Sequence, residues 1–241
     1  MLFRSSPVKT IADLKGKMLG LSHSGNPVEP MLKAYLADFG VKREEIRSQV
    51  VGNALPAAEA LKSGQIDATM QVTMSYATWR EAGYDFRILG EPRQFERLIG
   101  AAVGVRRAAL ADPERRAVIV RFLRGWAKTQ LFVKTNPQAA VELDYKLFPQ
   151  AKPRGMSDAD ALKRGMNAQD AVMDAYTNKV DGRWGAFRPA AFKDYSEFLG
   201  IAADVPDPSP LWTNDLIAEI NNFDEAAVIA KARNYKASDY K

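Results

Sequence analysis

Residues 11–26 read IADLKGKMLGLSHSGN, and residues 57–68 read AAEALKSGQIDA. The first stretch predicts a buried strand over Lys17–Leu21 that ends in the turn Ser22–Pro27. The second predicts the end of a helix, a glycine stop and the start of another strand. Strands and helices that alternate through such short turns are typical of βαβ units around a mainly parallel sheet.

The alternation continues on both sides of these stretches as far as residue 105. Strands are expected over Lys17–Leu21, Arg47–Val51, Ile66–Val72, Phe86–Leu89 and Ile99–Val105, with helices over Val28–Phe39, Ala54–Lys62 and Tyr76–Glu81. Residues 10–105 are therefore expected to form an α/β unit. Ligands of such a unit bind at the carboxyl ends of its strands.

Beyond residue 105 the pattern is helical. Pro113 opens a long helix, whose apolar positions run over Ala117–Val133. Further helices are expected over Pro137–Leu147, Asp158–Tyr176, Pro189–Leu199 and Asn214–Ile220. Helices without a sheet of their own need something for their apolar faces to cover.

The composition narrows the kinds of function available. The sequence holds no cysteine and one histidine, His23, which excludes disulfides, thiolate metal sites and a histidine-rich metal site within one chain. The net charge of +5 is spread along the chain, and acidic residues interrupt the arginine-rich segment 106–124. We therefore expect no nucleic-acid partner. No stretch approaches the ~20 apolar residues of a membrane span, and the chain shows no signal peptide.

At this point the residues resemble a known family. Ile11–Lys17, followed by the strand Leu19–Leu21 and the turn Ser24–Asn26, is similar to the motif that enters the second lobe of NMT1/THI5-like solute-binding proteins. That group includes binding proteins for sulfonates, nitrate and the pyrimidine precursor of thiamine. Residues 57–68 resemble a second family pattern, and residues 211–224 resemble the family's last helix.

The resemblance covers about residues 8–235 and implies a type II, periplasmic-binding-protein-like α/β fold with two lobes. Residues 10–105 would be the complete second lobe, with helices on both faces of its sheet, and residues 1–9 the crossover into it. Residues 106–241 would be the returning, mostly helical portion of a truncated first lobe. The family carries the rest of that lobe and a signal peptide ahead of this point, so Met1 is expected to be an internal methionine.

Removing part of a lobe has a consequence for the helices that cover it. We expect an exposed apolar surface on the helical portion, or a partner that covers it. The sequence leaves the oligomeric state open, a dimer through that surface included.

The turn Ser22–Pro27 is the first candidate for ligand binding. It lies where a strand ends and a helix begins, and the first N–H groups of a helix have no partner within it. Ser22 and Ser24 add hydroxyl groups, and Asn26 is a good N-cap before Pro27. His23, as a neutral imidazole, can both donate and accept hydrogen bonds. The plain alternative is a capped turn that binds nothing.

A second polar cluster follows the third strand. Because side chains alternate along a strand, Gln71, Thr73 and Ser75 are expected to point the same way. Asn53, after the second strand, would line the same edge of a parallel sheet. The predicted ligand-binding residues are Ser22, His23, Ser24, Gly25, Asn26, Asn53, Gln71, Thr73 and Ser75. Trp184 is expected to belong to the core rather than to a binding site.

Catalysis has little support, because the sequence contains no nucleophile elbow, no phosphate-binding loop and no dinucleotide fingerprint. We expect no enzyme, no metal and no cofactor. The leading interpretation is the periplasmic solute-binding protein of an ABC importer, which binds a small molecule between its lobes and delivers it to a membrane permease. The ligand would be a mono-anion or a neutral heterocycle.

Three alternatives remain open. The effector-binding domain of a LysR-type transcription regulator has the same two-lobed topology, and the missing signal peptide favours it slightly. An enzyme of thiamine-pyrimidine biosynthesis shares the fold but needs a cysteine cluster, which this chain lacks. The chain could also be an inert remnant.

Overall fold

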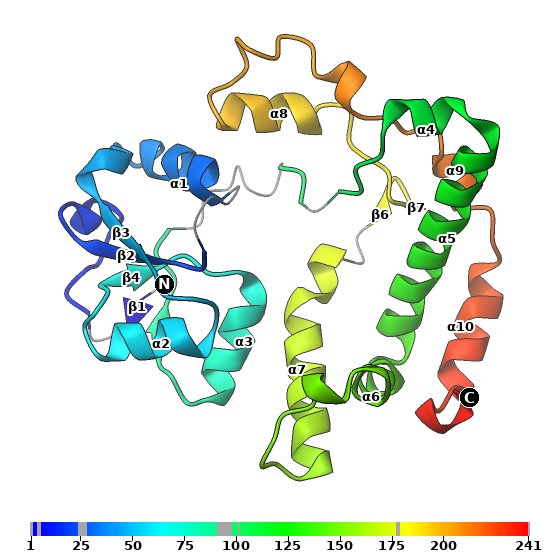
Figure 1. Ribbon diagram of the computed structural model, residues 1–241, viewed down its shortest axis with the longest axis horizontal. Coiled ribbons are helices and arrows are strands. Elements are labelled where there is room, and N and C mark those ends of the chain that lie inside the picture. The colour runs from blue at the N-terminus through cyan, green and yellow to red at the C-terminus, as the bar shows by residue number, and fades with distance from the viewer. Residues whose placement is uncertain are drawn as a thin grey trace. The chain divides into compact units, whose positions relative to one another are not determined.

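Two units make up the chain in the computed structural model (Figure 1). The first contains Met1–Leu98 and Ala190–Pro208, and the second contains Ile99–Pro189 and Ser209–Lys241. The structure describes residues 2–3, 6–23, 28–90, 98–100, 102–176 and 179–240. The expected division into lobes at residue 105 stays a prediction.

A three-stranded parallel sheet forms the centre of the first unit. Its order is β3 (Arg47–Val50), β2 (Met18–Leu21) and β4 (Ala68–Thr69). The chain starts in the central strand, moves to one neighbour and then returns across β2 to the other. Such an order creates a topological switch point between β2 and β4. The predicted parallel sheet is confirmed for these three strands.

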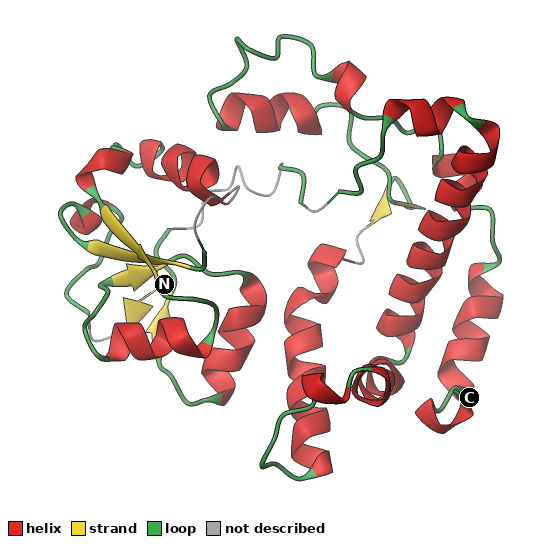
Figure 2. Cartoon of the chain, viewed as in Figure 1, coloured by secondary structure: helices red, strands yellow, loops and turns green. Residues whose placement is uncertain are grey.

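Helices cover both faces of this sheet (Figures 1 and 2). On one face α1 (Val28–Ala37) packs with Leu19 in one apolar cluster. On the other face α2 (Leu55–Lys62) and α3 (Thr73–Glu81) pack in a second cluster, against which the neighbouring residue Met18 lies. Met18 and Leu19, which are neighbours in β2, therefore point to opposite faces of the sheet and into different apolar clusters. This is typical of a strand that is buried on both faces.

Three strand predictions need correction. Phe86–Leu89 contains the strand β5 (Phe86–Arg87), but β5 pairs antiparallel with β1 (Leu2–Phe3) and stands outside the parallel sheet. The strand predicted over Ile66–Val72 shrinks to β4. Ile99–Val105 contains no strand within its described residues, 99–100 and 102–105, because an extended segment becomes a strand only when another strand pairs with it.

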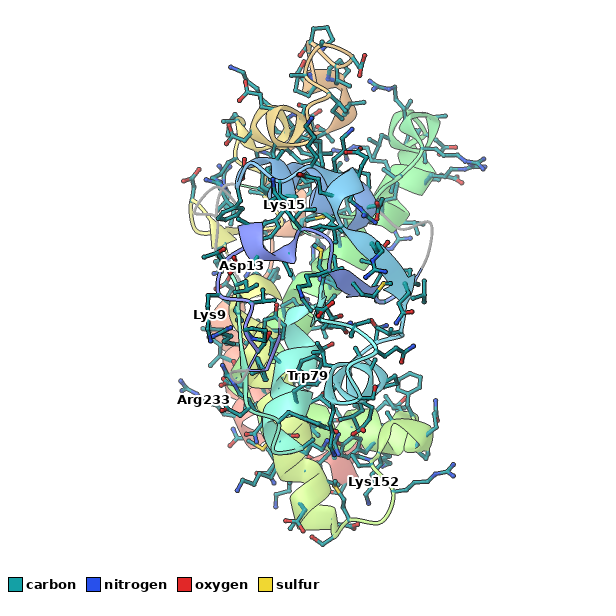
Figure 3. The ribbon with its side chains drawn as sticks, turned by 90° about the vertical axis from the view of Figure 1, so that its left-hand side faces the viewer. Lys9, Asp13, Lys15, Trp79, Lys152 and Arg233 are labelled. Atoms are coloured by element: carbon teal, nitrogen blue, oxygen red, sulfur yellow. The ribbon has the colours of Figure 1, made fainter. Side chains whose placement is uncertain are left out.

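The motif Ile11–Lys17 contributes apolar side chains to the core and a carboxylate that bonds to the backbone before it. Ile11 and Leu14 are each only 4% exposed and belong to the core beside α1. Asp13 Oδ2 accepts hydrogen bonds from the backbone N–H groups of Lys9 and Thr10, both at 2.8 Å. These bonds hold the pKa of the Asp13 carboxyl below its usual value. Asp13 and Lys9 lie close together at the surface in Figure 3.

The second unit is mainly helical. Its longest helix, α5 (Pro113–Thr135), begins where the Asp112 side chain accepts from the N–H groups of Glu114 and Arg115. α10 (Glu225–Asn234), which the sequence did not predict, packs along α5. The other helices are α4 (Arg107–Ala111), α6 (Pro137–Leu147), α7 (Asp158–Tyr176) and α9 (Ile217–Ile220), while α8 (Ala191–Phe198) belongs to the first unit.

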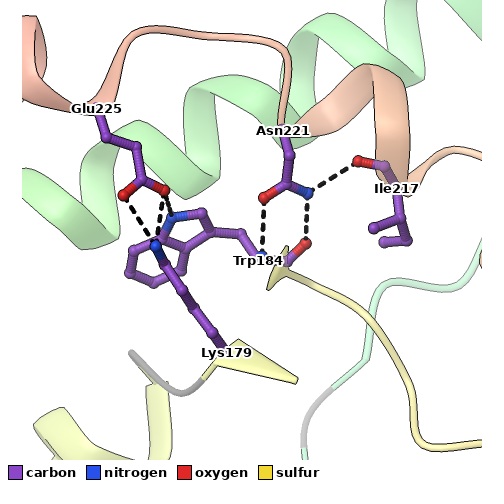
Figure 4. A network of polar contacts seen from close by, with 5 residues as sticks. All are labelled: Lys179, Trp184, Ile217, Asn221 and Glu225. Carbon is purple, nitrogen blue, oxygen red and sulfur yellow. Dashed lines mark hydrogen bonds and ion pairs between the residues drawn. The ribbon is translucent and has the colours of Figure 1, made fainter. Parts of the chain in front are cut away.

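A short hairpin packs against α9 and α10 in this unit. Its strands, β6 (Lys179–Val180) and β7 (Arg183–Trp184), are antiparallel. The Asn221 side chain pairs with the backbone of Trp184, donating to its carbonyl at 3.0 Å and accepting from its N–H at 2.8 Å (Figure 4). Trp184 is 4% exposed, so its predicted place in the core is confirmed.

Glu225 fixes the other side of Trp184 (Figure 4). Its carboxylate accepts from the indole Nε1 at 2.7 Å and forms an ion pair with Lys179, also at 2.7 Å. The Lys179 ammonium lies 4.9 Å from the centre of the Trp184 ring. The hydrogen bond from Lys179 is the main cause that lowers the pKa of Glu225.

The expected exposed apolar surface is present on α5. Val118, Phe122 and Trp126 follow one another at helical spacing and are 54%, 59% and 51% exposed. Within the described part of the chain, no helix combines the length and apolar character needed to cross a membrane.

Close packing of α6 against α7 leads to a first prediction. A Cβ added at Gly165 would clash with Val141 Cγ1 and lie 2.6 Å from Tyr145 Oη. We expect Gly165→Ala to lower the free energy of unfolding by about 1–2 kcal/mol, because overpacking outweighs the gain in helix propensity. Gly125, on the exposed side of α5, is the control, since a Cβ there would meet no described atom within 4 Å.

Gly125→Ala should raise the free energy of unfolding by about 0.5–1 kcal/mol, because it removes only the entropic cost of glycine. Urea denaturation of both variants measures the difference. Equal stabilisation by the two substitutions would show that α6 and α7 do not approach each other at Gly165.

Candidate functional site

Three loops meet at the carboxyl edge of the parallel sheet. β2 pairs with β3 up to Leu21 and Val50, and with β4 up to Gly20 and Thr69. The loops that follow these strands therefore leave the sheet at nearly the same level. They begin at Ser22, Val51 and Met70, and each leads into a helix. The loops after β2 and β4 flank the topological switch point, where open α/β sheets hold their ligands.

Part of the predicted site lies on this edge. Ser22 is half-buried and His23 is exposed directly after β2, and Asn53 is exposed after β3. Ser24, Gly25 and Asn26 fall outside the described residues. Ser22, Asn53 and Gln71 follow the ends of β2, β3 and β4, and their role in ligand binding stays a prediction.

The predicted alternation of Gln71, Thr73 and Ser75 is wrong. It required a strand through residue 75, but β4 ends at Thr69 and α3 begins at Thr73. Thr73 is in the first turn of α3, and its side chain lies outside the described part. Ser75 is 3% exposed and faces the interior.

Gln71 uses its side-chain amide to join two of the loops. Its Oε1 accepts from the backbone N–H of Ala54 at 3.1 Å and from Ser75 Oγ at 3.3 Å. Its Nε2 donates to the carbonyl of Gly52 at 3.2 Å and to Thr69 Oγ1 at 3.0 Å. We call these five residues the Gln71 network. It ties the loop after β3 to the loop after β4.

Ala54 has a backbone conformation that the sequence did not predict. Its φ is +52° and its ψ is −117°, a region that residues other than glycine rarely adopt. The Trp79 indole Nε1 donates to the Ala54 carbonyl at 2.8 Å. Ala54 is thus bonded through its N–H to Gln71 and through its carbonyl to Trp79, which lies on α3 in Figure 3.

Val72 is a further residue at this edge that the sequence analysis missed. It precedes α3 and is 62% exposed, more than most large apolar side chains of the chain. It would offer apolar contact beside the polar groups of Ser22 and Asn53. The sequence analysis placed Val72 at the end of the third strand, and that assignment concealed its position in the loop between β4 and α3.

The chemistry of the edge is polar but uncharged. The segments 22–27, 51–55 and 70–75 contain hydroxyl, amide and imidazole side chains and no Asp, Glu, Lys or Arg. Such groups donate and accept hydrogen bonds but supply neither a formal counter-charge nor a strong nucleophile. No group of three metal-ligating side chains comes together within the described residues.

Comparison with known families agrees with the sequence motifs. The profile of the family described as NMT1/THI5 like matches residues 1–140, more than half of the chain. The chain belongs to the NMT1/THI5-like family. The matched region contains the whole parallel sheet and all three loops of the carboxyl edge.

Solved structures extend the comparison of this NMT1/THI5-like chain. A protein from Bordetella bronchiseptica RB50 is 22% identical, with a TM-score of 0.58, over 89% of this chain and 66% of its own. The two proteins therefore share a fold, and this chain spans just under two thirds of the Bordetella chain. The alkanesulfonate-binding protein SsuA from Xanthomonas axonopodis pv. citri, bound to MOPS, is 18% identical, with a TM-score of 0.45, over 91% of this chain and 67% of its own. No curated protein sequence matched.

The unusual backbone of Ala54 gives a prediction for this NMT1/THI5-like chain. We expect Ala54→Gly to raise the free energy of unfolding by about 1 kcal/mol, because glycine adopts this conformation without strain. Ala230, exposed within α10, is the matched control, and Ala230→Gly should lower stability by about 1 kcal/mol. Urea denaturation compares the two, and a loss of stability in both variants would contradict the positive φ at Ala54.

Proposed function

We propose that this chain is the binding component of an ABC importer, holding a small solute at the carboxyl edge of its parallel sheet. The observation that carries the proposal is the meeting of three uncharged polar loops at the carboxyl edge of the sheet, where the loops after β2 and β4 flank the switch point. Membership of the NMT1/THI5-like family supports it. In the type II periplasmic-binding-protein arrangement that we propose, the first lobe would close over this edge of the second lobe, and a membrane permease would receive the solute in the periplasm.

The groups at the edge limit the kind of solute. Ser22, His23 and Asn53 can form several hydrogen bonds, while Val72 adds an exposed apolar surface. Because the three loops carry no arginine or lysine, the negative charge of a solute would have to be met by dipoles alone. These features support a neutral heterocycle or a mono-anion and disfavour a multiply charged ligand. They also favour binding over catalysis, since the loops contain no carboxylate, lysine or cysteine.

Calorimetric titration with methanesulfonate, nitrate and an aminopyrimidine tests the proposal. At least one of them should bind with a Kd below about 1 mM. In two-dimensional NMR spectra, the backbone amides of Ser22, Asn53 and Val72 should move on saturation. Asn53→Ala should weaken binding, whereas Asn222→Ala, an exposed amide in the other unit, should not. Shifts confined to other parts of the chain would place the binding site elsewhere.

A further inference from the structure

We propose that Gln71 is a positioning residue of the solute site: its amide fixes the loop Gly52–Ala54 and does not itself contact the solute. The inference rests on the proposed function, because it concerns the edge at which the solute would bind. It also changes the role that the sequence analysis gave to Gln71, which was that of a direct ligand.

The hydrogen-bonding capacity of Gln71 is already in use. A side-chain amide offers two N–H donors and an oxygen that accepts two bonds. In the Gln71 network the oxygen accepts from Ala54 and Ser75, and the two donors reach Gly52 and Thr69. A solute could bond to this amide only by displacing one of these partners, which would leave a polar group without its bond.

The orientation of the amide is also determined. The Ala54 N–H can only donate, so the atom facing it must be the amide oxygen. The Gly52 carbonyl can only accept, so the atom facing it must be the amide nitrogen. Turning the amide over would place donor against donor and acceptor against acceptor. The Gln71 amide can therefore form both bonds only when the loop has this arrangement.

The network connects the loop to the centre of the sheet. Thr69, which is 1% exposed, donates through its hydroxyl to the carbonyl of Gly20 in β2 at 2.8 Å. Gln71 donates to the same hydroxyl, so a continuous chain of hydrogen bonds runs from β2 to Gly52. Hydrogen bonds that form such a chain in the interior strengthen one another.

Asn53 is the residue that this arrangement positions. It is exposed, and it stands between Gly52 and Ala54, whose backbone groups Gln71 binds on either side. The positive φ of Ala54 sets the direction in which the chain leaves Asn53 and enters α2. If the amide of Gln71 is lost, Ala54 has fewer bonds to keep it in a strained conformation, and Asn53 moves.

Hydrogen exchange measured by NMR tests the first half of the proposal and needs no solute. In Gln71→Met, whose side chain is similar in length but forms no such bonds, exchange of the Ala54 amide should rise about tenfold. Exchange of the β2 amides Leu19 and Gly20 should stay unchanged. Gln49→Met is the matched control, since Gln49 donates to the carbonyl of Gln65 and has no bond to the loop Gly52–Ala54 within the described residues.

Solute binding tests the second half, with whichever of methanesulfonate, nitrate and the aminopyrimidine binds the wild-type chain. Gln71→Met should weaken that binding about tenfold, while Gln49→Met leaves it unchanged. Gln71→Glu keeps an acceptor for the Ala54 N–H but places a second oxygen against the Gly52 carbonyl, so it should restore only part of the slow exchange and of the affinity. In the wild-type chain, the side-chain NH2 signals of Gln71 should not move when the solute is added.

Two results would overturn the proposal: a large solute-induced shift of the Gln71 NH2 signals, which indicates direct contact, or unchanged Ala54 exchange in Gln71→Met. If none of the three compounds binds the wild-type chain, the proposed function fails, and the solute role of Gln71 fails with it. The exchange measurement then still decides whether Gln71 fixes the loop.

Discussion

Trp79→Ala lowers the free energy of unfolding by about 3–5 kcal/mol, the range expected when a buried tryptophan is truncated. Trp79 is 0% exposed and packs edge-on against Phe86, with ring centres 5.4 Å apart. Its indole N–H also provides the bond to the Ala54 carbonyl. The substitution therefore opens a cavity and removes a hydrogen-bond donor at the same place.

Trp126→Ala is the matched control, because it makes the same chemical change at a side chain that is 51% exposed on α5. It should alter stability by less than about 1 kcal/mol. Urea denaturation followed by circular dichroism measures both variants. Losses of similar size would contradict the burial of Trp79 beneath the sheet.

Asn221→Ala should lower the free energy of unfolding by about 2–3 kcal/mol, because three hydrogen bonds are lost next to a buried tryptophan. Two of these bonds join Asn221 to the backbone of Trp184, and the third, at 2.8 Å, goes to the carbonyl of Ile217. The hairpin β6–β7 loses its bonds to α9 when the amide is removed.

Asn222→Ala is the neighbouring control, since Asn222 is exposed and should change stability by less than about 0.5 kcal/mol. Asn221→Asp refines the test, because a carboxylate still accepts from the Trp184 N–H but cannot donate to the two carbonyls. Its stability, measured by thermal unfolding, should fall between that of the wild type and that of Asn221→Ala. An Asp variant as stable as the wild type would mean that the two donated bonds contribute nothing.

Local elements of the first unit could be predicted because their signals are local. β2, β3, α1 and α2 each lie within two residues of their expected ends. Gly40 and Gly64 stop the two helices with positive φ values of 66° and 74°, which is the conformation that favours glycine after a helix. The spacing of apolar residues and the glycines that follow the helices were therefore sufficient to predict these elements.

Pairing between strands could not be predicted in the same way. The period of apolar residues shows which face of a segment is buried, but not which strand lies beside it. β5 was expected in the parallel sheet and pairs with β1 instead. Val103 and Val105 alternate as in a strand, yet they are 54% and 43% exposed, and the described residues 102–105 form no strand.

The hairpin β6–β7 was missed although its signal is present. Asp181-Gly182 separates its strands, both residues have positive φ, and this dipeptide is the strongest short-range indication of a hairpin. The candidate site shows the opposite case. The edge of the sheet could be inferred from the order of strands and helices. The bonds of Gln71 depend instead on how the loops after β3 and β4 approach each other in space, which no local pattern contains.

The four tryptophans of the chain are divided unequally between its two units. Trp79 belongs to the first unit, whereas Trp126, Trp184 and Trp212 belong to the second. Intrinsic fluorescence can therefore distinguish the units, since a variant that keeps Trp79 alone emits from the α/β unit. Iodide quenches the half-exposed Trp126 far more than the buried Trp79 and Trp184. Unfolding curves recorded from the fluorescence of these tryptophans reveal whether the two units unfold together or one after the other.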